Sequence, residues 1–303
     1  MEIIKINDFI KKTKISIPDI EKFRKLNSFF PIDPNKPPTE ESFERGMLLY
    51  TLISKYKPKT VLEIGTAEGY STLCMAWAMS DMKISGKIFT IDPNSHNEPI
   101  DRTLNIDNQD KVENLSRKEI WEKFAEPEWL EKIIVKTGYS GKILSSESFP
   151  KIDFAFIDGH HYYKAVIHDF FATMKIASKH FRILFDDYVK NDYEGANKII
   201  DKEVLPNFEA TLIKSNIPDI EHFLCLIDSE FIKKPLENVF PKNKINVLLL
   251  EGVHDDAVAA FNNEGYNVVY SPDSLSEDEL CEKVKGVHVI GIRSKTKITK
   301  KVV

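Results

Sequence analysis

Short β-rich runs alternate with helix-like segments along the middle of the chain, and this alternation restricts the fold more than any other feature. Five such runs lie at residues 61–65, 87–92, 133–138, 153–158 and 182–187. Apolar residues at helical spacing fill intervening stretches such as 70–80 and 163–178. Because strands that alternate with helices form parallel sheets covered on both faces, we predict an α/β fold with five parallel strands.

Two further β-rich runs, at residues 210–214 and 222–228, follow without room for a helix between them. Neighbouring strands without a crossover must pair antiparallel. The predicted sheet is therefore Rossmann-like, with five parallel strands and an antiparallel pair.

The length and charge of the chain argue against several classes of protein. Its 303 residues are enough for about two domains. A formal net charge of −5 gives no basic field for binding nucleic acid or an anionic membrane. No apolar run is long enough to predict a membrane-spanning helix, and the charged N-terminus does not resemble a signal peptide. The three cysteines are far apart, so we expect a cytoplasmic protein without a zinc site.

The sequence divides into four segments. Residues 1–42, with a weak helical pattern and a proline-rich stretch at 31–38, are expected to form a helical and extended lead-in. Residues 43–230 contain the predicted sheet. Residues 231–243 are expected to be a linker, and residues 244–303 carry a second, shorter α/β pattern.

The stretch between residues 92 and 133 is longer than one crossover helix needs. It contains three large aromatic residues, Trp121, Phe124 and Trp129. They predict either a lid over a substrate pocket or an extra helix packed on the edge of the domain.

A turn of small residues follows the first predicted strand and leads into a helix. The candidate ligand-binding residues of this segment are Glu63, Gly65, Thr66, Ala67, Gly69, Tyr70 and Ser71. Small residues let the backbone approach a ligand closely, and a helix N-terminus offers free amides. The last glycine of a dinucleotide fingerprint is absent, since Tyr70 stands there, so a pyrophosphate fits poorly. Tight turns also carry glycine for packing alone.

The second predicted strand ends in Asp92. A carboxylate at this point can accept hydrogen bonds from the ribose hydroxyls of a nucleoside. Capping a loop is the alternative role. The glycine turn one strand earlier favours the nucleoside.

Three more acids stand where the fourth and fifth predicted strands end. They are Asp158, Asp186 and Asp187. Because the carboxyl ends of adjacent parallel strands meet at one edge of the sheet, these groups should converge there, where open α/β sheets bind ligands. Their mutual repulsion predicts a cation between them, and oxygen ligands favour Mg²⁺, Mn²⁺ or Ca²⁺ over zinc. The alternative is that they only cap strands and loops.

Two strings that contain these acids resemble motifs of class I S-adenosylmethionine-dependent methyltransferases related to the macrocin and catechol O-methyltransferases. The IDGxHxY motif is matched by Ile157-Asp158-Gly159-His160-His161-Tyr162-Tyr163, and the DDY motif by Phe185-Asp186-Asp187-Tyr188. The spacing of Glu63, Gly65 and Gly69 resembles the first motif of the same enzymes. The resemblance implies S-adenosylmethionine as cofactor, held by the turn, Asp92 and Asp158. It implies a divalent metal, Mg²⁺ or Mn²⁺, on Asp158, Asp186 and Asp187. Asp169 also matches a recurrent acid of the family.

The resemblance implies a single displacement in three parts. The metal chelates the substrate oxygen and lowers the pKa of the hydroxyl, a neighbouring base removes its proton, and the oxygen attacks the methyl group of the sulfonium in line. A histidine can act as this base near neutral pH. His161 is the first candidate and His160 the second, with one of them orienting or capping. The chain departs from the family at Lys179-His180-Phe181, where relatives have a Pro-Gly-Gly turn. It also has Tyr139 where many relatives carry an acid near the adenine, so Tyr139 is expected to stack on the base.

The last 60 or so residues have a different character and resemble the N-terminus of D-3-phosphoglycerate dehydrogenase, a flavodoxin-like βαβαβ pattern. The resemblance implies that Arg293 and Ser294 contact anionic groups of a substrate, while Lys295 replaces the usual Arg. The nicotinamide domain of that family is missing from this sequence. A gene fusion or a truncated reading frame is expected to explain the match.

Three hypotheses follow. The first is an O-methyltransferase for a small-molecule or sugar hydroxyl, with no nucleic-acid or membrane partner. The second is an inactive methyltransferase fold that serves as a binding protein. The third is a fragment of a fusion with a dehydrogenase-like enzyme. The methyl acceptor is not determined by the fold, and a homo-oligomer remains open.

Overall fold

The computed structural model describes residues 2–29, 43–106, 109–189, 195–217, 220–232, 244–263 and 265–302. The chain forms two compact units, Met1–Lys233 and Lys234–Val303, which are described separately. The proline-rich stretch at 31–38 and most of the expected linker, residues 233–243, lie outside the described residues.

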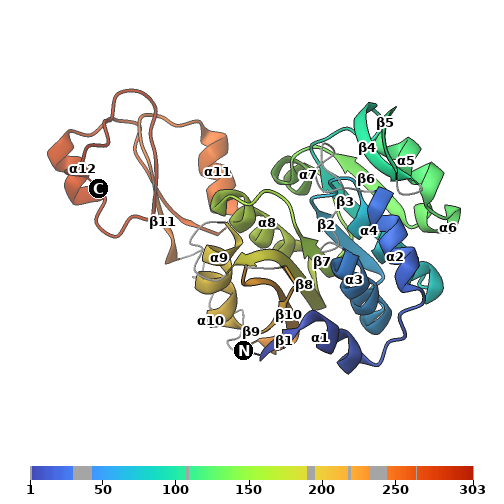
Figure 1. Ribbon diagram of the computed structural model, residues 1–303. Helices are drawn as coiled ribbons and strands as arrows, with labels where there is room; N and C mark the ends of the chain where they lie inside the picture. The colour runs from blue at the N-terminus through green and yellow to red at the C-terminus, as the bar shows by residue number, and fades with distance from the viewer. Residues whose placement is uncertain are drawn as a thin grey trace. The chain divides into compact units, whose positions relative to one another are not determined.

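The first unit is built on an eight-stranded sheet (Figure 1). Its strands are β1 (Glu2–Lys5), β2 (Thr60–Ile64), β3 (Lys87–Asp92), β6 (Ile133–Thr137), β7 (Ile152–Ile157), β8 (Ala177–Val189), β9 (Phe208–Lys214) and β10 (His222–Ile232). Their order in space is β1-β9-β10-β8-β7-β2-β3-β6. The pairs among β6, β3, β2, β7 and β8 are parallel, while β10 is antiparallel to both β8 and β9. The predicted sheet of five parallel strands and an antiparallel pair is confirmed.

Helices cover both faces of this sheet, because its central strands are apolar on both sides. On one face α3 (Phe43–Tyr56) packs on α4 (Tyr70–Asp81). On the other face α7 (Ser140–Ser146) packs on α8 (Tyr163–Ile176). A short helical region follows β8, made of α9 (Ala196–Ile199), a π-helical turn (Ile200–Val204) and α10 (Leu205–Asn207).

The N-terminal segment is more than the expected lead-in. Strand β1 pairs in parallel with β9 and so extends the edge of the sheet. It is followed by α1 (Ile6–Thr13) and α2 (Ile20–Phe29). Phe23 on α2 is fully buried, and its ring lies 4.4 Å from that of Trp77 on α4. The first residues of the chain therefore share the core of the methyltransferase-like sheet.

The long stretch between β3 and β6 folds into a hairpin and two helices. The hairpin is formed by β4 (Ile100–Ile106) and β5 (Gln109–Leu115), and the helices are α5 (Arg117–Phe124) and α6 (Pro127–Leu130). Trp121 and Trp129 are buried, and Trp129 stacks on Trp77 at 5.1 Å. The two indoles are core residues, so the structure supports the packed helix over the predicted lid.

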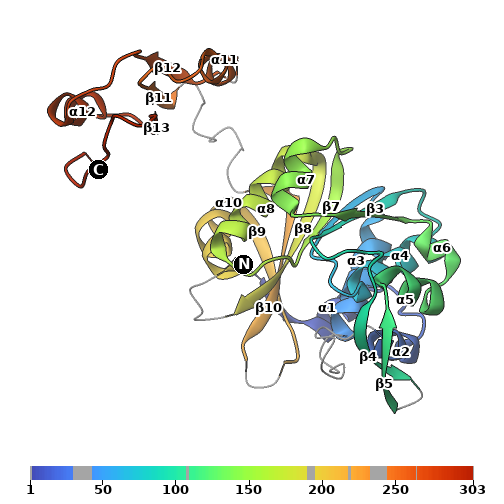
Figure 2. The ribbon, with the colours of Figure 1, turned by 90° about the horizontal axis from the view of Figure 1, so that it is seen from above.

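The second unit is a small parallel sheet in the order β12-β11-β13, seen in Figure 2. Its elements are β11 (Asn246–Leu249), α11 (Asp255–Asn263), β12 (Asn267–Tyr270), α12 (Glu277–Lys283) and β13 (Val289–Gly291). Leu248, Leu250 and Leu280 form its buried core with Val302. The predicted βαβαβ pattern is confirmed.

Across the parts of the chain that the structure describes, no helix has the length and apolarity that crossing a membrane requires.

Candidate active site

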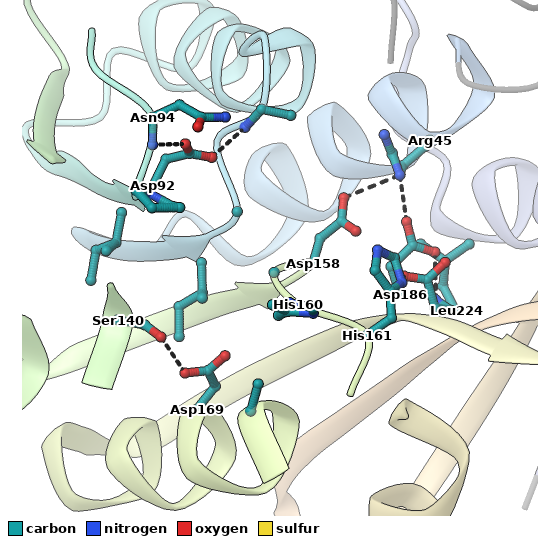
Figure 3. A pocket seen from close by; sticks show the side chains of 18 of the residues that line it. Arg45, Asp92, Asn94, Ser140, Asp158, His160, His161, Asp169, Asp186 and Leu224 are labelled. Atoms are coloured by element: carbon teal, nitrogen blue, oxygen red, sulfur yellow. Dashed lines mark hydrogen bonds and ion pairs between the residues drawn. The ribbon is translucent and has the colours of Figure 1, made fainter. Parts of the chain in front are cut away.

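A cavity of about 610 Å³ opens at the carboxyl ends of β2, β3, β7 and β8. The glycine turn and Asp92 line one part of it, as Figure 3 shows, and the acids that follow β7 and β8 line another. Ile6 of α1, Ser215 and Ile217 also contribute to the wall. The N-terminal segment and the β9–β10 connection thus help to enclose a site whose chemistry comes from the central strands.

The glycine turn brings its backbone to the edge of this cavity. Gly65 has φ +95°, and a Cβ there would overlap the carbonyl group of Asp158. Glycine is required because the β2 and β7 ends approach so closely. Ala67, with φ +46°, donates its amide to Asp92 Oδ2 at 2.9 Å. Gly65, Ala67 and Asp92 therefore line the same cavity, and a hydrogen bond joins the last two.

Glu63 and Thr66 lie behind the turn, outside the cavity wall. The Thr90 hydroxyl donates a hydrogen bond to Glu63 Oε2 at 2.6 Å. A second hydrogen bond of 2.6 Å joins the hydroxyls of Thr90 and Thr66. Thr72 of α4 also donates to Glu63. Burial raises the pKa of Glu63 to about 7, against the hydrogen bonds from Thr72 and Thr90. These residues tie β2, β3 and α4 together and so fix the turn.

Gly69, Tyr70 and Ser71 also stand outside the cavity wall. Gly69 has φ +103°, and a Cβ there would overlap the indole of Trp121. The Tyr70 hydroxyl donates to the carbonyl oxygen of Phe43 at 2.9 Å, which joins α4 to the start of α3. Ser71 is buried in the first turn of α4. Of the ten predicted cofactor residues, Gly65, Ala67, Asp92, Tyr139 and Asp158 line the cavity, and the other five support it.

Asp92 is held on three sides. Besides the amide of Ala67, its carboxylate accepts the amide of Asn94 at 2.7 Å and lies 3.2 Å from Nη2 of Arg117. Arg117 is fully buried, and its Nε and Nη1 have no hydrogen-bond partner among the described residues. The carboxylate of Asp92 is thus fixed in orientation at the wall of the cavity.

The loop after β6 forms the next part of the wall. Tyr139 is 72 % exposed, so its ring is free to cover a flat ligand. The Ser140 hydroxyl donates to Asp169 Oδ1 at 2.6 Å. Asp169 is buried, which raises its pKa. Asp169 lines the cavity and also holds the β6 loop against α8.

The acids after β7 and β8 converge as predicted, but they meet an arginine. Nη1 of Arg45, on α3, lies 3.1 Å from Asp158 Oδ2 and 2.5 Å from Asp186 Oδ2. Burial opposes the charge of Arg45, yet the carboxylates of Asp158, Asp186 and Asp187 raise its pKa well above the usual value. Burial raises the pKa of Asp158, while Arg45 opposes that rise. A fixed guanidinium therefore joins the ends of two adjacent strands (Figure 3).

Two histidines contact the same acids from the other side. His161 Nδ1 lies 2.6 Å from Asp187 Oδ2, and this hydrogen bond raises the pKa of His161 to about 9. His222 Nε2 lies 3.2 Å from Asp186 Oδ1 and 3.6 Å from Asp187 Oδ1. Burial opposes the charge of His222, but hydrogen bonds to both acids raise its pKa to about 9. His160 lines the cavity with its ring 4.4 Å from that of Tyr162.

The sequence-based prediction missed Arg45, His222 and Arg117. Arg45 stands among ordinary helical residues of α3, and nothing in its spacing marks it. His222 carried a usable signal, because it begins a predicted strand, and the structure places this strand antiparallel beside β8, which carries two of the acids. Such a strand starts where its neighbour ends, and the register indeed pairs His222 with Val189.

A divalent cation was predicted on Asp158, Asp186 and Asp187. Among the described residues, Asp186, Asp187 and His222 instead form the group that could hold an ion. Their three candidate ligand atoms lie within 4.8 Å of one another. Asp158 is engaged by Arg45, which also contacts Asp186. The predicted set of three acids therefore does not fit a metal in this arrangement.

The first unit matches a known family. Residues 62–188 match the family described as a methyltransferase domain. The O-methyltransferase TomG from Streptomyces achromogenes, solved in complex with SAM, superimposes with a TM-score of 0.50 at 16 % identity. The superposition covers 74 % of this chain and 96 % of TomG. At this identity the likeness establishes the fold.

The C-terminal unit matches a second family. Residues 247–303 match the catalytic domain of D-isomer specific 2-hydroxyacid dehydrogenases. D-3-phosphoglycerate dehydrogenase from Dictyostelium discoideum is 51 % identical over 63 residues, which are 21 % of this chain and 16 % of that protein. D-3-phosphoglycerate dehydrogenase 2 from Saccharomyces cerevisiae is also 51 % identical over 63 residues, 21 % of this chain and 13 % of that protein. The chain thus spans a small part of these relatives.

The predicted contact residues of this unit, Arg293 and Ser294, follow β13 and are exposed. Glu251 accepts the amides of Ser294 at 2.7 Å and Lys295 at 2.9 Å, so the loop that carries them is held in place. Residues 62–188 thus match a methyltransferase domain, and residues 247–303 match the catalytic domain of D-isomer specific 2-hydroxyacid dehydrogenases.

Proposed function

We propose that the first unit transfers a methyl group from S-adenosylmethionine to a hydroxyl of a small molecule. The observation that carries this proposal is that the nucleoside-type surface and the acid–histidine cluster line one cavity. A methyl donor and a hydroxyl acceptor can therefore meet there without leaving the site. Holding two reactants in one orientation is a large part of what a transferase contributes to the rate.

The cofactor half of the cavity fits S-adenosylmethionine in donor and acceptor chemistry. Asp92 would accept the ribose hydroxyls, the backbone of Gly65 and Ala67 would face the amino acid end, and Tyr139 would cover the adenine. When bound, the cofactor supplies an electrophilic methyl group. The turn keeps its place without a ligand because Glu63, Thr66 and Thr90 fix it from behind.

The acceptor half offers a base that is already oriented. Asp187 holds Nδ1 of His161, which leaves Nε2 as the ring nitrogen that takes the hydroxyl proton. Because the same contact raises the pKa of His161 to about 9, the neutral form that acts as the base becomes the major form only above that pH. The carboxylate then stabilises the imidazolium that forms, and the substrate oxygen is left as the nucleophile. His160, the second candidate base, shares the cavity but is placed against Tyr162 instead of an acid. The contact with Asp187 favours His161.

The main alternative is an inactive methyltransferase fold that only binds a ligand. A protein that merely binds a nucleoside has no need of a histidine oriented by an acid beside the site. The third hypothesis, a fragment of a dehydrogenase-like fusion, concerns the second unit and leaves the chemistry of the first unchanged.

Calorimetric titration with S-adenosylmethionine tests the cofactor half, using the full chain. We expect saturable binding that Asp92→Ala abolishes, while Asp101→Ala, on the β4–β5 hairpin, leaves it unchanged. Release of S-adenosylhomocysteine is then followed with a panel of sugars, catechols and other small hydroxyl compounds. No binding of S-adenosylmethionine would refute the proposal. Binding without turnover of any acceptor would favour the inactive binding protein.

A further inference from the structure

Two of the acids at the ends of β7 and β8 are already paired with a cationic side chain, that of Arg45. Asp186 is almost fully buried, with 2 % of its side chain exposed, and Asp158 is exposed by 17 %. Carboxylates this buried need a positive partner, since leaving them unpaired costs several kcal/mol each. One nitrogen of Arg45 serves both. In this respect the guanidinium does what a divalent ion would do between the same two oxygens.

Arg45 is held in this position by the packing of α3 on α4. The residue after it is Gly46, where a Cβ would overlap the hydroxyl and ring of Tyr70. Tyr70 in turn donates to the carbonyl oxygen of Phe43, two residues before Arg45. The close approach of the two helices therefore fixes where the arginine side chain starts. A side chain anchored this way is part of the fold and not a mobile surface group.

Oxygens of Asp186 and Asp187 also contact two histidines. Asp187 lies against His161, and both Asp186 and Asp187 lie within 3.6 Å of His222. A metal on Asp186, Asp187 and His222 would have to displace these hydrogen bonds. It would also lie beside a guanidinium that is 2.5 Å from one oxygen of its own ligand Asp186. A cation about 4 Å from this guanidinium would be repelled by about 4 kcal/mol per unit of its charge, even at the effective dielectric constant of about 20 that applies in proteins.

We propose that Arg45 is the resident cation of this cluster, holding Asp158 and Asp186 together so that the acceptor half of the site is assembled without a divalent metal. Arg45 is a positioning residue in this scheme. It takes Asp158 out of the set of metal ligands that the sequence predicts. Removing it should turn the three acids into a cation site.

Binding of Mn²⁺ tests this inference, followed by the electron paramagnetic resonance signal of the free ion and without cofactor or acceptor. We expect the wild-type chain to bind Mn²⁺ weakly and Arg45→Met to bind it at least about tenfold more tightly, because a repulsive charge is lost and Asp158 is freed. Adding Asp158→Asn to Arg45→Met should remove the gain. Arg24→Met, which removes the same charge from the surface of α2, should behave as wild type.

A thermal melt shows whether Arg45→Met is folded. If it is not, two more variants still test the inference. Arg45→Lys retains a cation and should keep Mn²⁺ binding weak. Asp158→Asn alone should leave the weak binding of the wild type unchanged. The inference is overturned if the wild type binds Mn²⁺ as tightly as Arg45→Met, if Asp158→Asn abolishes wild-type binding, or if Arg24→Met gains affinity equally. Because methyl transfer is not measured, failure of the proposed function would leave these outcomes unaffected.

Discussion

The guanidinium of Arg117 is buried against the carboxylate of Asp92, with Nη2 3.2 Å from Oδ1. Arg117 begins α5, and Asp92 ends β3, so the pair joins the inserted helix to the predicted nucleoside site. Asp92 is therefore a structural residue as well as a candidate ligand residue. Its two roles can be separated by experiment.

We expect Arg117→Met to lower the free energy of unfolding by about 3 to 5 kcal/mol, because it leaves the buried carboxylate of Asp92 without its cation. The double variant Arg117→Met/Asp92→Asn should recover much of this loss, since the second change removes the unpaired charge. Urea denaturation of the single and double variants measures both effects. Strictly additive losses would show that the pair is not coupled.

Gly69→Ala should destabilise the first unit by about 2 to 4 kcal/mol, because the position has a positive φ and a Cβ would overlap the Trp121 ring. Gly141→Ala is the matched control. Gly141 lies in α7 without a positive φ, so the same change there should be neutral or slightly stabilising. Thermal unfolding compares the two, and an equal loss would argue against the role given to Trp121.

The pH dependence of stability should carry the signature of Glu63. Its pKa is raised by burial from 4.5 to about 7, so the folded state holds a proton that the unfolded state has already lost in this interval. Stability should therefore fall as pH rises from about 4.5 to 7, by roughly 3 kcal/mol at 1.36 kcal/mol per pKa unit. Glu63→Gln, which cannot ionise, should remove this slope.

Urea titrations at several pH values check the effect, with Glu128→Gln on α6 as an exposed carboxylate control. Persistence of the full slope in Glu63→Gln would mean that another group is responsible. A loss of slope in Glu128→Gln would have the same meaning.

His161→Ala should lower kcat by about 10²- to 10⁴-fold, the usual contribution of a positioned base, and leave S-adenosylmethionine binding unchanged. Asp187→Asn should lower kcat as well, because it removes the group that orients His161. His160→Ala should have a much smaller effect on kcat. Turnover and calorimetric binding measured on the same samples distinguish these cases. The reverse order of the two histidines would assign the base to His160.

Much of the fold followed from local sequence patterns. The β-rich runs and helical spacing predicted the central strands closely, because each strand is an apolar run bounded by turn residues. The edge strand β1 was not predicted, because it has only four residues, three of them exposed, and carries no such pattern; it forms by pairing with β9. The hairpin β4–β5 was not predicted either, because its two strands also lack an apolar run.

The sequence by itself determined which acids and glycines gather at the sheet edge, since parallel strands must end on the same side. The resemblance of residues 157–163 to a methyltransferase motif also indicated His161, which lies in the loop after β7. Only the tertiary structure decided what faces the acids. Arg45 comes from a helix 141 residues before Asp186, and His222 comes from a strand that runs the opposite way beside β8. Contacts of that kind depend on helix packing and strand register, which no local pattern records, and they place an arginine and a second histidine beside the acids that the sequence predicts to bind a metal.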